Sequence, residues 1–421
     1  MISQYGIFPI RIGGVEKFTY NILSRICQDK RFECILVIPK EERINQDILR
    51  ASLRRYNILV LPVKTIPYRL FKLLPAYILY LISIPVWTII IVKSLVKFKP
   101  HIIHIHNITD VAIAAMLVKL LMKLIGYSEI PLFITTAHGR DLVMWLIKRR
   151  TFTSLLNEVV QRLCSNILDY LVFTNPLTFI YAKKWNIAEK ASIIPPCVAI
   201  DANVHKVKEI DRRDVLHKKS LIFLCVSRID KEKNIDNLLF AFSKLIKYLR
   251  YESKTFTYTH PKNIKLIIAG SGPLLRDMKE LALKLGLIEN VIFWGNVSEQ
   301  MLEFLYKTAD CVVIPSAYEG FSMTLVEALA YGVPIIAYRY LPAVVMISQD
   351  FRRYIGIVID SPTADELFKA MLEFIHKLDY FAKYSELRRK LVIESLNCDL
   401  ISMKYINVYF KLLKNLKRSG A

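Results

Sequence analysis

The sequence is short of acidic residues and lacks the usual signatures of nucleic-acid-binding proteins. Asp and Glu number 37 against 59 Lys and Arg, which leaves a formal net charge of +22. Such an excess favours polyanionic partners, namely nucleic acid, an anionic lipid surface or a phosphate-bearing substrate. The chain has no zinc-finger spacing and no RNP-type segment, and its basic residues are spread along its length. We therefore expect no nucleic acid among its partners.

Cysteine is scarce and follows no recognisable pattern. The 7 cysteines are odd in number and no Cys-x-x-Cys occurs. Cys225 and Cys311 fall within apolar runs, which suits small buried hydrophobic side chains. No signal peptide precedes the first motif. These features predict reduced thiols, a reducing compartment and a cytoplasmic location.

Hydrophobic residues, by contrast, make up 53% of the 421 residues, enough for two domains with sizeable cores. Short apolar runs alternate with helical stretches, which predicts parallel sheets and an α/β fold of two Rossmann-like, doubly wound domains. The first strand should be short, because only Met1 to Ser3 precede a loop. The other expected strands are residues 35–38, 58–61, 102–105, 132–135, 171–174 and 192–194, then 221–226, 265–269, 291–293, 311–314, 334–337 and 356–359.

A charged segment with little apolar periodicity, Asp201 to Lys219, separates the two sets of strands. We expect a first domain at residues 1–203, a linker at 204–219 and a second domain at 220–381. A further helical stretch is expected at 382–421.

The most informative segment runs from Pro315 to Pro334, P-S-A-Y-E-G-F-S-M-T-L-V-E-A-L-A-Y-G-V-P. Glu319 lies in a turn after an expected strand, and Glu327 lies on the next expected helix. Ligands of open α/β sheets bind at the carboxyl ends of strands, so both carboxylates can face one site. A glycosidase pair is the rival interpretation. A helical rise of about 1.5 Å per residue sets the two roughly 10 Å apart, whereas a retaining hydrolase needs about 5 Å.

This segment resembles the donor-site signature of retaining GT-B glycosyltransferases, particularly glycosyltransferase family 4. The matching residues are Glu319, Gly320, Phe321, Ser322 and Glu327. The resemblance implies two domains that face each other across a cleft, and a last helical stretch, 382–421, that returns to the first domain. It also implies that Glu327 binds the ribose of a nucleotide sugar and that Glu319 binds the sugar hydroxyls.

Residues 227–234, S-R-I-D-K-E-K-N, resemble the family's G-R-x-x-x-E-K-G segment. There an Arg and a Lys bind the donor diphosphate, which implies this role for Arg228 and Lys233. Ser227 and Asn234 replace the usual glycines, and Asn tolerates the left-handed backbone that the turn requires. The alternative is a solvated basic loop.

Several glycine-rich turns also resemble family segments at the donor. Gly13 and Gly14 open an expected helix in a G-G-V-E loop, where the backbone can approach a diphosphate. Gly270 and Gly272 form a G-x-G-P turn after a strand. Val291 begins V-I-F-W-G, which resembles the strand that contacts the base. Ordinary structural turns and an ordinary strand remain the alternatives.

His138 follows an expected strand in T-T-A-H-G-R-D, where the family often has a His near the donor sugar. His138 and Glu319 are thus the expected catalytic residues, and a turn-stabilising His138 is the alternative. His104 and His106 alternate with apolar residues and should share one face of a strand. No nearby Cys or carboxylate completes a metal site, so we expect neither metal nor cofactor, as the resemblance also implies.

Residues 73–92 are 20 residues without a charge, and Lys72 and Lys93 flank them. A buried helix, an interfacial insertion and a membrane span all stay open. Pro85 should interrupt a helix there, and the run lies inside the first domain, which argues against a span. The net charge favours peripheral attachment to anionic lipid.

The resemblance implies a retaining, metal-independent glycosyltransferase that uses a UDP- or GDP-linked sugar. A lipid-linked glycan or a precursor of a surface polysaccharide is the expected acceptor. Three departures keep alternatives open: the short first strand, P-P-C-V at 195–198 in place of P-N-G-V, and R-Y-L-P-A-V at 339–344 where a Gly-Gly segment is common. A non-catalytic partner subunit at the membrane is the second hypothesis, and a nucleotide-sugar epimerase is the third.

Overall fold

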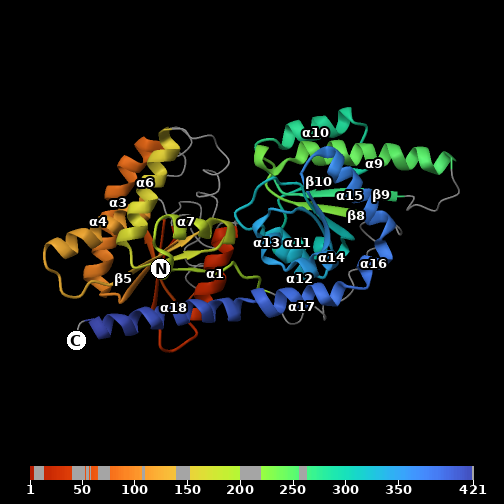
Figure 1. The fold of residues 1–421 in the computed structure, drawn as a ribbon. Coiled ribbons are helices and arrows are strands. Elements are labelled where there is room, and N and C mark those ends of the chain that lie inside the picture. Colours follow the sequence, from red (N-terminus) through yellow and green to blue (C-terminus); the bar gives the residue numbers. More distant parts are fainter. Residues whose placement is uncertain are drawn as a thin grey trace. The chain divides into compact units, whose positions relative to one another are not determined.

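The computed structural model describes residues 1–3, 14–39, 53, 56, 58–64, 76–106, 110–138, 152–199, 220–255 and 263–419. The chain divides into two compact units (Figure 1). Unit 1 comprises Met1–Ala199 and Cys398–Ala421, and unit 2 comprises Ile200–Asn397. The predicted linker at 204–219 and Gly13 lie outside the described residues.

Unit 1 is built on a seven-stranded sheet in the order β3-β2-β1-β4-β5-β6-β7, and its strand pairs are parallel. The inner strand β1 is only two residues long, as the sequence predicts, and pairs with both β2 and β4. The strands are β1 (Ile2–Ser3), β2 (Cys34–Pro39), β3 (Ile58–Val63), β4 (Ile102–His106), β5 (Leu132–Ala137), β6 (Tyr170–Phe173) and β7 (Ala191–Ile193).

Helices cover both faces of this sheet. Right-handed crossovers place α3, α4 and α6 on one face, where they share a hydrophobic core with β4 to β6. Helices α1 and α18 pack together on the other face (Figure 1). The helices are α1 (Gly14–Ile26), α3 (Ala76–Phe98), α4 (Asp110–Leu124), α6 (Phe152–Ile167), α7 (Ile180–Lys184) and α18 (Cys398–Ser419).

Helix α3 shows that the prediction of a break at Pro85 was wrong, because the helix continues through that residue. Pro85 lies on the exposed side, and its missing N–H removes one backbone hydrogen bond. Trp87, Ile90 and Ile91 are buried on the opposite side, so packing offsets that loss. Among the described residues, no helix is long and apolar enough to cross a membrane.

Unit 2 has a six-stranded parallel sheet in the order β10-β9-β8-β11-β12-β13. Its strands are β8 (Ser220–Val226), β9 (Asn263–Ala269), β10 (Val291–Gly295), β11 (Cys311–Ile314), β12 (Ile335–Tyr338) and β13 (Gly356–Ile359). Its helices are α9 (Ile235–Thr255), α10 (Leu275–Lys284), α11 (Glu299–Thr308), α12 (Met323–Ala330), α13 (Pro342–Met346), α14 (Gln349–Ile355), α15 (Ala364–His376), α16 (Leu378–Ala382) and α17 (Ser385–Leu396).

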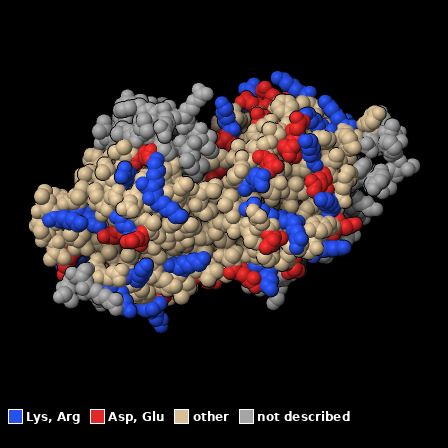
Figure 2. Space-filling view, in the orientation of Figure 1, with Lys and Arg blue, Asp and Glu red and all other residues tan. Residues whose placement is uncertain are grey.

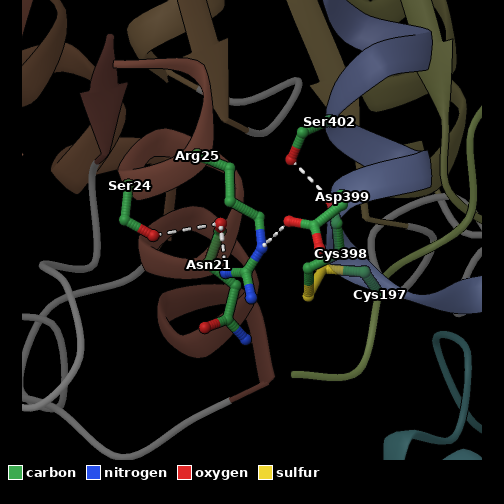
Figure 3. Close-up of a disulfide and its surroundings, with 7 residues drawn as sticks. All are labelled: Asn21, Ser24, Arg25, Cys197, Cys398, Asp399 and Ser402. Atoms are coloured by element: carbon green, nitrogen blue, oxygen red, sulfur yellow. Dashed lines mark hydrogen bonds and ion pairs between the residues drawn. A yellow bond between two sulfur atoms is a disulfide. The ribbon is translucent and has the colours of Figure 1, made fainter. Parts of the chain in front are cut away.

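Four of the seven cysteines form disulfides, so the prediction of reduced thiols was wrong for them. Cys27 pairs with Cys34, and Cys197 pairs with Cys398 at the start of α18 (Figure 3). The second pair is 201 residues apart in sequence, a proximity that only the tertiary fold creates. Cys225 and Cys311 are free and buried, as predicted.

An ion pair lies beside the Cys197–Cys398 disulfide. Arg25 at the end of α1 contacts Asp399 on α18, with 2.8 Å between Nε and Oδ1 (Figure 3). Both contacts tie α18 to the rest of unit 1, although the ion pair is too exposed to contribute much stability.

Candidate functional site

The carboxyl ends of β8 and β11 in unit 2 bring Lys233 and Glu319 together. Lys233 Nζ donates to Glu319 Oε1 at 2.6 Å, and Ser316 Oγ donates to the same oxygen at 2.8 Å. The Lys233 and Glu319 side chains are 20% and 16% exposed. The two segments that carry the sequence motifs therefore meet at one edge of the sheet, where parallel sheets bind ligands.

Asn234 shapes the turn that positions Lys233. Its backbone is left-handed, with φ of 57° and ψ of 34°, as the replacement of glycine predicted. Its side-chain Nδ2 donates to the carbonyl oxygens of Pro315 and Pro362, at 3.0 and 2.6 Å. Asn234 therefore links the turn after β8 to the segment after β11, which a glycine could not do.

Arg228 lies on the same turn but extends toward solvent. Its side chain is 59% exposed, and its Nε lies 3.2 Å from Asp230 Oδ2. An exposed pair of this kind is weak, so the guanidinium can exchange Asp230 for another anion at little cost. Arg228 and Lys233 thus supply two cations on the segment after β8, of which Lys233 contacts the Glu319 carboxylate.

Glu327 on α12 is held by a residue of the preceding helix. Tyr306 on α11 donates its hydroxyl to Glu327 Oε2 at 2.9 Å, and its ring stacks on Tyr331 with centroids 5.3 Å apart. Burial, and then the charge of Glu327, raise the pKa of Tyr306 well above its usual value, so the phenol stays protonated. Glu319 and Glu327 are therefore held by different residues, Lys233 and Ser316 in one case and Tyr306 in the other.

Gly270 and Gly272 allow close approach of two backbone segments. A Cβ on Gly270 would lie 1.9 Å from the carbonyl oxygen of Ser227, and one on Gly272 would lie 2.1 Å from that of Ile229. Gly270 also has a φ of 139°. Both glycines thus support the loop that carries Arg228, which gives them a structural role beside any contact with a ligand.

The residues between Glu319 and α12 form a constrained turn. Phe321 is buried and its carbonyl accepts from Ala343 N at 3.2 Å. Ser322 has a φ of 80°, unusual for a residue other than glycine. Its buried hydroxyl makes no hydrogen bond within the described part of the chain. Together with Gly320, these residues connect Glu319 to the first turn of α12, which begins at Met323.

Val291 does not join this cluster. It is the first residue of β10, pairs with Leu266 in register, and buries its side chain in the core of unit 2. The strand reaches the carboxyl edge at Gly295, whose carbonyl accepts from Gly270 N at 2.7 Å. Any contact of this strand with a ligand would therefore come from its far end.

In unit 1, three histidines stack at the ends of β4 and β5. The rings of His104 and His106 have centroids 4.8 Å apart, and those of His106 and His138 are 5.3 Å apart. His104 and His106 share one face of β4, as predicted. Phe18 of α1 packs edge-on against His106 and His138. Gly14 begins the same helix.

Hydrogen bonds connect this stack to α18. His104 Nδ1 lies 2.5 Å from the Tyr409 hydroxyl, and its Nε2 lies 2.8 Å from Thr136 Oγ1. His106 Nδ1 lies 3.1 Å from His138 Nε2. Both nitrogens of His104 are therefore occupied by hydroxyl groups.

One nitrogen in the stack, His106 Nε2, is buried and has no hydrogen-bond partner among the described residues. An unpaired buried N–H is costlier than an unpaired acceptor. The favoured tautomer of His106 therefore has its proton on Nδ1 and donates it to His138 Nε2. His138 then carries its own proton on Nδ1 and offers a donor there.

Burial keeps these histidines uncharged near neutral pH. It lowers the pKa of His104 and of His138 to about 3. Burial, reinforced by the neighbouring histidines, also holds the pKa of His106 well below its usual 6.5. A neutral His138 can donate or accept a hydrogen bond, but it cannot supply positive charge.

Two residues of this arrangement are not predicted by the sequence. Tyr306 lies 21 positions before Glu327 on another helix, so no local pattern connects them. Ser316 lies inside the motif, and its position at the end of an apolar strand was the available signal.

Comparisons with known proteins agree with this architecture. A family model described as Glycosyl transferases group 1 matches residues 207–391, and one described as Glycosyltransferase Family 4 matches residues 12–202. The sucrose-phosphate synthase structure from Thermosynechococcus elongatus has a TM-score of 0.73 at 17% identity, covering 98% of this chain and 99% of that one. The fold is thus that of the GT-B glycosyltransferases.

The chain belongs to the group 1 glycosyltransferases of family 4. The alpha-monoglucosyldiacylglycerol synthase of Streptococcus pneumoniae is 33% identical over 132 residues, 31% of this chain and 27% of that protein. The match thus spans about a quarter of that relative's length. A GDP-mannose-dependent alpha-(1-6)-phosphatidylinositol monomannoside mannosyltransferase of Mycobacterium tuberculosis is 21% identical over 418 residues, 94% of each chain.

Proposed function

We propose that this glycosyltransferase transfers a sugar from a UDP- or GDP-linked donor to an acceptor hydroxyl with retention of the anomeric configuration. The observation that carries the proposal is the cluster of Lys233, Glu319 and Ser316 at the carboxyl edge of unit 2, with Glu327 on the helix that follows. This edge combines cations for a diphosphate with carboxylates for hydroxyl groups.

Each side chain has a role that follows from its chemistry. Arg228 and Lys233 bind the diphosphate, because charge-assisted hydrogen bonds to phosphate oxygens are strong. Glu327 accepts from the ribose hydroxyls, and Tyr306 holds it in place. Glu319 accepts from the sugar hydroxyls once Lys233 turns to the diphosphate. His138 donates a hydrogen bond to the sugar.

The proposed transfer takes place on one face of the sugar. The acceptor oxygen bonds to the anomeric carbon on the face from which the nucleoside diphosphate leaves, while the bond from that carbon to the phosphate oxygen breaks. The acceptor proton passes to the departing phosphate. Arg228 and Lys233 stabilise the negative charge that develops there, so we propose that neither metal nor cofactor is required.

The acceptor we propose is a lipid-linked glycan or a precursor of a surface polysaccharide, used at the cytoplasmic face of a membrane. One relative is named as a monoglucosyldiacylglycerol synthase and another as a phosphatidylinositol monomannoside mannosyltransferase, and the net charge of +22 suits an anionic surface. Once formed, the Cys197–Cys398 disulfide would be reduced slowly in such a compartment, since the two cysteines are 1% and 2% exposed and a thiolate must reach a sulfur to exchange.

The test is isothermal titration calorimetry of the full chain with UDP, GDP and their sugars. The wild type should bind one nucleotide in the micromolar range, and Glu327→Ala should lose that binding. Glu373→Ala is the matched control, because Glu373 makes an exposed pair with Lys377 on α15, a helix that carries none of the proposed donor residues. A folded wild type that binds no nucleotide would overturn the proposal and favour a non-catalytic partner subunit.

The fate of a bound donor also distinguishes a transferase from an epimerase. A transferase should consume the nucleotide sugar appreciably only when an acceptor is present. An epimerase would convert the donor without one, and the product sugar released by acid would identify it.

A further inference from the structure

We propose that Tyr409 of α18 is a positioning residue for sugar transfer. Its hydroxyl fixes the ring of His104, and the stacked imidazoles thereby fix the orientation of His138. The inference deepens the proposed function and rests on it, because the orientation of His138 affects transfer only when His138 donates to the sugar. By this route α18 acts on the reaction through neighbouring side chains rather than through a contact with the substrate.

His104 is held at both of its ring nitrogens. Its Nδ1 lies 2.5 Å from the Tyr409 hydroxyl, and its Nε2 lies 2.8 Å from Thr136 Oγ1. All three residues are buried, so water does not compete for either nitrogen. Half a turn of the ring would place carbon atoms where the two nitrogens now lie, and both hydrogen bonds would be lost. The two hydroxyl groups therefore hold His104 in one orientation.

The direction of these two hydrogen bonds follows from the acidity of the hydroxyl groups. A phenol is more acidic than an aliphatic hydroxyl and is therefore the better donor. Burial, and then the nearby Tyr405, raise the pKa of Tyr409 well above its usual value, so the phenol keeps its proton. Tyr409 thus donates to Nδ1 of His104. His104 carries its own proton on Nε2 and donates it to Thr136.

The ring of His104 in turn orients the other two imidazoles. His106 lies between His104 and His138, with interplanar angles of 23° and 21°. Its Nδ1 lies 3.1 Å from His138 Nε2, while its Nε2 has no hydrogen-bond partner in the part of the chain that the structure describes. The plane of His106 therefore depends on the rings around it, and His104 is the one held by two hydroxyl groups. That plane sets the direction in which His106 donates to His138.

Helix α18 presents Tyr409 from its buried side. Ile401, Tyr405 and Tyr409 recur every four residues and are buried, whereas Lys404 and Lys411 are exposed. Figure 2 shows lysine and arginine side chains along the edge of unit 1 where α18 lies in Figure 1. Such a helix keeps its charged side in water and packs its apolar side on the protein. The packing of the whole helix thus places the Tyr409 hydroxyl at His104.

Contacts outside the histidine stack anchor this helix. At its start, a disulfide joins Cys398 to Cys197 (Figure 3). Farther along, Phe32 packs edge-on against the ring of Tyr409, with centroids 6.1 Å apart. Neither contact uses the Tyr409 hydroxyl. A substitution that removes only this hydroxyl therefore leaves the anchoring of α18 intact.

The test compares Tyr409→Phe with a matched control on the same helix, Tyr405→Phe. Tyr409→Phe removes the hydrogen bond to His104 and keeps the ring against Phe32. Tyr405 is also buried, but among the described residues its hydroxyl makes only a long contact, 3.4 Å, to Thr136 Oγ1. If Tyr409→Phe does not fold, Thr136→Val takes its place, because it removes the partner of the other His104 nitrogen.

The first measurement is the slow hydrolysis of the nucleotide sugar that calorimetry selects, with water in place of the acceptor. The water oxygen bonds to the anomeric carbon, its proton leaves with the nucleoside diphosphate, and the free sugar is quantified. Tyr409→Phe should release sugar about tenfold more slowly, the effect expected from one lost hydrogen bond. Tyr405→Phe should match the wild type. Nucleotide affinity should stay unchanged in both variants, because the proposed contacts with the nucleotide lie in unit 2.

The second measurement, nitrogen-15 spectra of labelled histidine, needs no activity. The wild type should show one tautomer for each ring, with the proton of His104 on Nε2 and the protons of His106 and His138 on Nδ1. Tyr409→Phe should replace the single signals of His106 and His138 by a mixture of tautomers. Tyr405→Phe should leave these signals unchanged. Substitution of each histidine in turn by glutamine assigns the signals.

Three results would overturn the proposal: unchanged signals of His106 and His138 in Tyr409→Phe, hydrolysis at the wild-type rate by that variant, or an equal loss in Tyr405→Phe. Where hydrolysis by the wild type is too slow to follow, the spectra alone decide. Circular dichroism shows whether each variant is folded. Failure of the proposed function looks different, since nucleotide binding by the wild type would then be absent while the spectral change in Tyr409→Phe persists.

Discussion

At the carboxyl ends of β8 and β11, unit 2 holds its polar side chains by opposite charges, with Lys233 against Glu319. At the carboxyl ends of β4 and β5, unit 1 stacks His104, His106 and His138 and keeps them uncharged by burial. The two edges are equivalent places in two Rossmann-like sheets. They nevertheless stabilise partly buried polar groups differently, by an ion pair in unit 2 and by stacked neutral rings in unit 1.

The difference indicates what each edge can bind. A charged pair can be opened by a competing ion, so the edge of unit 2 is suited to a diphosphate. Neutral imidazoles bind through directed hydrogen bonds, which suits a sugar hydroxyl. Acid, charge removal and loss of a single hydrogen bond should therefore affect the two edges to different extents.

Acid should produce the largest difference between the units. The pKa of His104 is lowered to about 3, and that of His106 also lies well below 6.5. Below pH 6.5 these histidines therefore become protonated in the unfolded chain while they stay neutral in the folded chain. The contribution of these histidines to stability is fully present above pH 6.5 and is lost as the pH drops, by roughly 1 kcal/mol per pH unit for His104.

Hydrogen exchange measured between pH 7.5 and 5 checks this expectation within one molecule. After correction for the intrinsic rates, amides of β4 and β5 should lose protection more steeply than those of β8 and β11. Equal slopes in the two sheets would show that the histidine stack does not control the acid response.

Removing the Lys233 side chain of unit 2 should have the next largest effect. Lys233→Ala is expected to weaken nucleotide binding about 100-fold, since a charge-assisted contact to phosphate in a half-buried position contributes about 2–3 kcal/mol. Calorimetry measures the change. Lys244→Ala is the control, because Lys244 makes an exposed pair with Asp365; a similar loss there would point to a general charge effect.

Loss of one hydroxyl should have a smaller effect. Tyr306→Phe keeps the stacked ring but leaves Glu327 without its donor, and nucleotide affinity should fall about tenfold. Tyr380→Phe, at a 36% exposed tyrosine of α16, should change nothing. An unaltered nucleotide affinity in Tyr306→Phe would mean that the Tyr306 hydroxyl does not position Glu327 for binding.

The smallest effect is expected for a change at His106, and it concerns the rate of sugar transfer. His106→Leu should slow sugar transfer several-fold, whereas His106→Asn, whose amide can still donate to His138, should recover part of the rate. Nitrogen-15 spectra of labelled histidine give an independent readout. They should show the proton of His138 on Nδ1 in the wild type and a shift toward Nε2 in His106→Leu; the opposite wild-type tautomer would contradict the assignment.

Much of this fold is predictable because short segments of the sequence determine it. The strands, the two-residue β1 and the left-handed Asn234 depend on short segments, and the sequence predicts them. The effect of Pro85 was wrongly predicted because burial of Trp87, Ile90 and Ile91 in the core of unit 1 outweighs the local preference of proline. Tyr306, which holds Glu327 from another helix, and the Cys197–Cys398 bond depend on contacts between distant segments, which a single sequence does not reveal.

The Cys197–Cys398 bond has a consequence for the whole of unit 2. Cys197 lies two residues before unit 1 gives way to unit 2, and Cys398 is the first residue after the chain returns. Unit 2 is therefore a covalently closed ring, and a single proteolytic cut within it should leave the full mass intact until a reductant is added. When the whole chain unfolds, this bond still closes a loop of that size, which reduces the entropy gain of unfolding by about 5 kcal/mol. The oxidation state of one buried bond in unit 1 thus affects the stability of a chain segment that lies almost entirely in unit 2.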